Sequence, residues 1–149
     1  MKKIGTIENH YAIYWKSTGH YRVEFQSAGH TISLSSFEYY PRMSEETNAF
    51  VANLILDGVM VGECSNEGRG GCANYYAYNN LDLANTIAGI VSHIENFCFP
   101  RVNLSLYDVI DQLADYYIIF GEMKTSAMAK RAVEELNQRA EQLRERYSK

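Results

Sequence analysis

The chain has 149 residues, of which 46% are hydrophobic, a composition typical of one globular domain and not of a disordered segment. The net charge of −4 is unevenly placed: residues 1–123 carry seven Lys/Arg against fourteen Asp/Glu, whereas residues 124–149 carry seven against four. An acidic body argues against nucleic acid as a direct partner, because phosphate binding requires a basic surface.

Strands are predicted over most of the first eighty residues, where apolar residues alternate. Residues 10–17, 21–25 and a third strand around Ile32 and Leu34 form a predicted meander with short turns. Residues 37–48 contain Pro41 and a polar cluster, which predict a loop.

A hairpin is predicted at residues 49–65. Asp57-Gly58 lies between two apolar runs and favours a type I′ turn, which requires φ > 0 at both central positions. The second run enters a glycine-rich loop, Asn66–Gly71, and residues 74–78 are predicted to add a further strand. We therefore expect an antiparallel sheet of five to six strands within residues 1–79.

Three helices are predicted within residues 80–149, where the apolar period becomes helical. The first covers residues 81–97, with Asn79 or Asn80 as its N-cap and an apolar set that reaches Ile94 and Cys98. Ser105 and Asp108 form a predicted capping box for a second helix that ends at Gly121.

The third predicted helix is basic and spans residues 124–148, with an apolar stripe formed by Met128, Ala132, Leu136, Leu143 and Tyr147. This narrow stripe could pair with a second copy of the chain as a homodimer. Strands followed by helices predict a single α+β domain over residues 1–149, with the helices packed on one side of the sheet.

A carboxylate ridge is predicted on the second helix, opposite its apolar stripe. At 100° per residue, Asp108, Asp111, Asp115 and Glu122 share one side, and Ile118 and Ile119 flank them. Such a ridge could bind a basic surface on a partner protein, and an ordinary solvated helix face is the alternative interpretation.

The glycine-rich loop allows a second hypothesis, a site for a small ligand or nucleotide. Glycines let backbone N–H groups approach a phosphate, and Arg69 could pair with it. No Lys-Ser/Thr follows the last glycine, so an architectural turn is the alternative interpretation. The candidate ligand residues are Asn66, Gly68, Arg69, Gly70 and Gly71.

The cysteines give a third hypothesis, a cysteine enzyme that uses Cys64 or Cys72. Free cysteine is more often a small buried apolar residue. Three cysteines do not suit a disulfide framework, and their spacing does not suit a zinc site. We therefore predict no catalytic residue, no metal and no cofactor.

The cellular setting is also constrained. No apolar run reaches the roughly 18 residues of a membrane span, and charged and polar residues interrupt the first fifteen positions, unlike a secretory signal. We expect a cytoplasmic protein without membrane contact.

The segment Phe50–Gly71, with the pattern FxANLxxDGxxVGxxSNxGxGG, resembles small uncharacterised proteins of bacteriophages and mobile elements. The resemblance covers about twenty residues and implies an accessory role in a bacterial host. With the acidic body and twelve tyrosines, it leads us to expect a non-enzymatic protein that binds and inhibits a host protein, such as a CRISPR effector, in the host cytoplasm.

Overall fold

The computed structural model describes residues 1–78 and 80–148. Within them, one antiparallel sheet contains seven strands whose spatial order follows the chain. This confirms the α+β class, with one strand more than the upper expected number. The strands are β1 (Lys2–Ile7), β2 (Tyr11–Ser17), β3 (His20–Ser27), β4 (His30–Tyr39), β5 (Phe50–Leu56), β6 (Val59–Asn66) and β7 (Asn74–Ala77).

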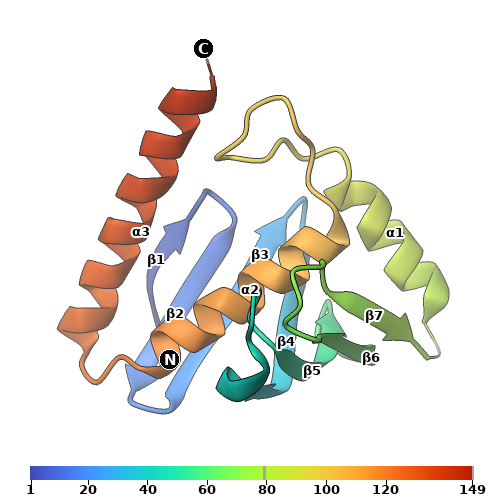
Figure 1. The fold of residues 1–149 in the computed structure, drawn as a ribbon, viewed down its shortest axis with the longest axis horizontal. Helices are drawn as coiled ribbons and strands as arrows, with labels where there is room; N and C mark the ends of the chain where they lie inside the picture. The colour runs from blue at the N-terminus through green and yellow to red at the C-terminus, as the bar shows by residue number, and fades with distance from the viewer. Residues whose placement is uncertain (79, 149) are drawn as a thin grey trace.

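In the part of the chain that the structure describes, three helices cover one face of the sheet (Figure 1). They are α1 (Leu81–Val91), α2 (Leu106–Gly121) and α3 (Ser126–Tyr147). Helix α3 packs on β1 and β2, α2 crosses β3 and β4, and α1 lies against β5 and α2. None of the described helices combines the length and apolar character needed to span a lipid bilayer.

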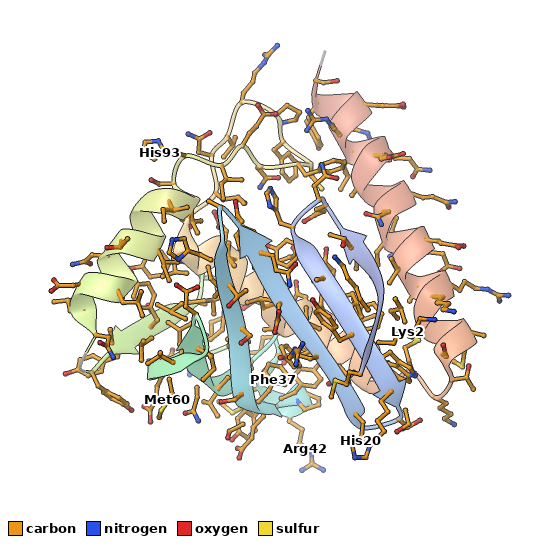
Figure 2. All side chains as sticks on the ribbon, turned by 180° about the vertical axis from the view of Figure 1, so that it is seen from behind. Lys2, His20, Phe37, Arg42, Met60 and His93 are labelled. Carbon is orange, nitrogen blue, oxygen red and sulfur yellow. The ribbon has the colours of Figure 1, made fainter. Side chains whose placement is uncertain are left out.

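The core lies between the sheet and the helices. Phe25, Leu54 and Phe120 are fully buried there, and each such side chain contributes roughly 1.5–3 kcal/mol by leaving water. The opposite face of the sheet carries no helix among the described residues (Figure 2). Over β2 and β3 that face carries polar surface contacts, since Arg22 pairs with Glu24 at 2.7 Å and lies over the ring of Tyr14.

The Asp57-Gly58 turn joins β5 to β6 as predicted. Both residues have positive φ, 51° and 78°, as a type I′ turn requires. The Asp57 carboxylate also accepts a hydrogen bond from the Thr31 N–H at 2.8 Å and contacts His30 Nδ1 at 2.6 Å. The turn is therefore tied to the start of β4.

Two parts of the sheet differ from the sequence prediction. Strand β1 was not predicted, because its six residues include Gly5 and two lysines. Gly5 is required there, since a Cβ would lie 2.7 Å from Cγ1 of Val133 on α3. Strand β4 continues to Tyr39, into the predicted loop, and a 3₁₀ turn (Pro41–Met43) follows.

The first helix is shorter than predicted, since α1 ends at Val91 and not at residue 97. Ile94 and Cys98 are shielded from water, but they lie in the loop that follows. The helical spacing of apolar residues therefore continues beyond the end of the helix. Asn80 occupies the N-cap position without a side-chain hydrogen bond, contrary to the predicted cap, and Asn79 lies outside the described residues.

The second helix begins at the predicted capping box, in which Ser105 and Asp108 exchange hydrogen bonds. The third helix is placed correctly, but its buried face is rotated. The buried residues are Ala129, Ala132, Val133 and Ala140. Of the predicted stripe, Ala132 is buried and Leu136 packs against the core, whereas Met128 and Tyr147 are exposed. This buried face packs against β1 and β2, so a homodimer through α3 would have to use exposed residues of the helix.

Candidate functional site: the acidic face around helix α2

The predicted carboxylate ridge is present on α2, but its members have different environments. Asp108 is exposed at the helix start, where its Oδ2 accepts a hydrogen bond from the Ser105 N–H at 3.1 Å. An acidic side chain at this position also interacts favourably with the positive end of the helix dipole. Glu122 is exposed at the other end of the helix, beside its C-terminus.

Asp111 is a structural anchor and not a freely solvated group. Its Oδ1 accepts a hydrogen bond from Asn66 Nδ2 at 3.0 Å, and its Oδ2 accepts one from the Ala73 N–H at 2.8 Å. Burial raises the pKa of Asp111, although these two hydrogen bonds act in the opposite direction. The carboxylate therefore attaches the glycine-rich loop to α2.

Asp115 holds a second loop in the same way. Its Oδ1 accepts a hydrogen bond from Asn48 Nδ2 at 2.8 Å, which fixes the connection between β4 and β5. Burial raises the pKa of Asp115, and the nearby Asp111 adds to the rise. Asp111 and Asp115 are therefore not part of an ordinary solvated helix face, because loops distant in sequence pack over the ridge.

One acidic hollow lies between this loop and α2. It encloses about 380 Å³ and is lined by residues 44–48 together with Asp111 and Asp115. Glu45 and Glu46 are exposed at its edge. We call this space the loop hollow.

A second hollow, of about 300 Å³, lies on the other side of α2. We call it the α2–α3 cleft, because its walls come from these two helices, the β1–β2 turn and the 96–104 loop. Asp108, Asp115 and Ile119 of the predicted ridge line this cleft, together with Glu8 and Arg139. Ile118 is half-buried and is not among the residues that line either hollow.

The ridge therefore forms the centre of a larger acidic face. Among the described residues that line the two hollows, six carry carboxylates, and Arg139 alone carries a permanent positive charge. Glu8, Glu45 and Glu46 were not predicted as part of this face, because no local pattern connects a turn and a loop to a helix about sixty to one hundred residues away.

The glycine-rich loop is fixed by its own hydrogen bonds. The Gly68 N–H donates to Asn66 Oδ1 at 2.8 Å, and the Gly70 N–H donates to Thr47 Oγ1 at 3.3 Å. The Gly68 carbonyl accepts from the N–H groups of Glu45 and Glu46. Because these loop N–H groups already have protein partners, the geometry favours the architectural turn over the phosphate site.

The other candidate ligand residues of the glycine-rich loop also fit an architectural turn. Asn66 Nδ2 also donates to the Gly71 carbonyl at 3.0 Å, and Arg69 is exposed. The Glu46 carboxylate lies so close to Gly70 that a Cβ there would collide with it. A negative charge in this position would repel a phosphate.

The cysteines differ in exposure. Cys64 is buried under α2, and burial raises the pKa of its thiol to about 12. Cys72 is exposed in the loop. A buried thiol with a raised pKa is a poor nucleophile, so Cys64 resembles a packed core residue.

The uncovered sheet face has a hollow of its own, about 470 Å³ over β5, β6 and β7. Glu63, Asn53 and Tyr76 line it, and Tyr76 packs edge-to-face against Tyr78 with ring centroids 5.5 Å apart. Five of the twelve tyrosines are exposed, namely Tyr40, Tyr76, Tyr78, Tyr107 and Tyr147. In the described chain, Glu63 is the single charged residue that lines this hollow. The hollow therefore selects less strongly for a basic partner than the α2 face does.

Comparison with protein-family models, with curated proteins and with solved structures finds no match to this chain.

Proposed function

We propose that the protein is a non-enzymatic binding protein whose acidic α2 face binds a basic surface on a partner protein. The observation that supports this proposal is the convergence of six carboxylates, from α2, the β1–β2 turn and the 44–48 loop, around two adjacent hollows. Complementary charge accelerates association and selects partners of opposite sign.

The resemblance of Phe50–Gly71 to bacteriophage and mobile-element proteins supports a host protein as that partner. Inhibition of a host defence component in the bacterial cytoplasm is the role that we propose for the complex. A homodimer through α3 stays a separate prediction.

The test is a charge reversal at the exposed edge of the loop hollow. In the double variant Glu45→Lys with Glu46→Lys, the backbone hydrogen bonds to Gly68 are retained, because they come from the N–H groups. Glu134→Lys with Glu135→Lys is the matched control, since these exposed neighbours on α3 give the same change in net charge.

The immobilised protein and both variants are incubated with bacterial lysate at about 0.15 M salt, where charges more than about 8 Å apart are largely screened. We expect the wild type and the α3 control to retain one defined protein. The loop variant should bind that protein at least tenfold more weakly, which corresponds to about 1.4 kcal/mol. Equal retention by both variants would count against the proposed surface.

A further inference from the structure

The α2–α3 cleft has features of a specific binding site that the charge of the α2 face does not explain. Its walls are mostly apolar, with Ile119 from α2 and Leu136 and Leu143 from α3. Its floor is Tyr11 of β2, whose ring packs edge-to-face on Tyr116 with centroids 5.1 Å apart. Apolar walls with a few polar groups are typical of ligand sites.

The Tyr11 hydroxyl is unpartnered within the described chain. The residue is 2% exposed, and no hydrogen bond connects its hydroxyl to any described residue, although other tyrosines such as Tyr21 and Tyr117 have such bonds. No fully enclosed side-chain nitrogen or oxygen in the described residues lacks a partner. The Tyr11 oxygen must therefore keep slight exposure, and the cleft that the residue lines provides it.

Three carboxylates that line the cleft act electrostatically on Tyr11. The charges of Glu8, Asp108 and Asp115 all act on Tyr11 and, with burial as the larger cause, raise its pKa. The hydroxyl therefore stays protonated, and its lone pairs can accept hydrogen bonds. The polar side of the cleft is thus rich in acceptors.

Glu8 is held in place from two sides. Its N–H donates to Asn137 Oδ1 on α3 at 3.1 Å, and its Oε1 accepts from the Cys98 Sγ–H at 2.9 Å. Burial raises the pKa of Cys98 to about 12, so the thiol remains a donor and not a nucleophile. Burial raises the pKa of Glu8, and among the described residues no Lys or Arg forms an ion pair with its carboxylate, although Arg139 also lines the cleft.

We infer that the α2–α3 cleft receives the guanidinium group of an arginine side chain from the partner. A guanidinium has five N–H donors in a fixed plane, which suits acceptors that come from three different elements. It is also less strongly hydrated than an ammonium group, and its aliphatic stem matches the apolar walls. This inference rests on the proposed function, because it names the group through which the basic partner is recognised.

The test uses the full chain and N-acetyl-arginine methylamide as the probe, followed by backbone amide NMR shifts. We expect a dissociation constant on the order of 1 mM and shifts that cluster at Leu104, Gln112 and Ala140 around the cleft. The lysine analogue should bind more weakly, and the uncharged norleucine analogue should give no clustered shifts.

Tyr11→Phe removes only the unpartnered hydroxyl, so the variant should fold like the wild type. It should weaken binding of the arginine probe on the order of tenfold, which is the effect expected from losing a hydrogen bond to a charged group. Tyr14→Phe is the matched control, because the Tyr14 hydroxyl accepts from Gln26 on the opposite face of the sheet.

Shifts outside the cleft, equal affinity for lysine and arginine, or unchanged affinity in Tyr11→Phe would overturn the inference. If the probe fails while Glu45→Lys with Glu46→Lys still abolishes partner capture, the arginine site is wrong and the proposed function stands. If the probe binds the cleft but that variant captures the partner normally, the proposed loop surface is wrong.

Discussion

Asn66 Nδ2 donates a hydrogen bond to Asp111 Oδ1 at 3.0 Å, across 45 positions of the chain. The same amide bonds the Gly71 carbonyl, and its oxygen accepts from the Gly68 N–H and the Thr47 hydroxyl. One buried asparagine therefore joins the glycine-rich loop, the 44–48 loop and α2. The shape of the acidic face depends on this residue.

Asn66→Ala should lower the free energy of unfolding by about 3 kcal/mol, because several buried partners lose their hydrogen bonds at once. Urea denaturation measures the change. Asn74→Ala, at an exposed position of β7, is the control and should cost well under 1 kcal/mol. A loss at Asn66 no larger than the control would show that its network is not structural.

Gly68→Ala should destabilise more than Gly58→Ala. Both glycines have positive φ, 84° and 78°, which costs an alanine roughly 1–2 kcal/mol. At Gly58 a Cβ would meet open space, whereas at Gly68 it would collide with the Met43 carbonyl, which adds roughly 1–3 kcal/mol of overpacking. Thermal unfolding of the two variants gives the comparison, and equal midpoints would contradict the tight packing at Gly68.

Burial raises the pKa of Asp115, so the folded state keeps its proton at pH values where the unfolded chain has lost it. Between the ordinary aspartate pKa, near 4, and the raised value, the free energy of unfolding therefore falls as pH rises. Asp115→Asn removes this titration and retains an oxygen for Asn48. We expect the variant to gain stability relative to wild type as pH rises through that window.

Urea denaturation at a series of pH values, from about 3.5 to about 7.5, tests this sign. Glu122→Gln, at the exposed end of α2, is the control and should follow the wild-type profile. A profile of Asp115→Asn parallel to wild type would mean that Asp115 is not perturbed.

Iodoacetamide at neutral pH should modify one of the three thiols in the folded protein. Cys72 is exposed, whereas burial raises the pKa of Cys64 and of Cys98 to about 12. Peptide mass spectrometry identifies the modified position, and urea-unfolded protein is the control in which all three react. Rapid modification of folded Cys64 would revive the cysteine-enzyme hypothesis.

Local sequence signals predicted much of the fold. The Asp57-Gly58 turn and the Ser105–Asp108 capping box were predicted because each depends on neighbouring residues. The end of α1 was predicted wrongly. Ile94 is partly buried against the core in the loop after the helix, and an apolar residue at that spacing looks in the sequence like one more turn of helix.

The candidate site was only partly predictable for a related reason. Helical periodicity placed Asp111 and Asp115 together, but it could not show that Asn66 and Asn48 pack over them. Glu8 lies at the same face because it is in the β1–β2 turn, and its N–H donates a hydrogen bond to Asn137, 129 positions away in the chain. Such contacts depend on the tertiary fold, which no local pattern encodes.

Hydrogen–deuterium exchange on the complex with the captured partner tests the central claim most directly. We predict slower exchange on binding in the 44–48 loop, in α2 and at the Glu8–Asn9 turn, the segments that line the loop hollow and the α2–α3 cleft. Protection confined to β5, β6 and β7 would instead place the partner on the uncovered sheet face and contradict the account.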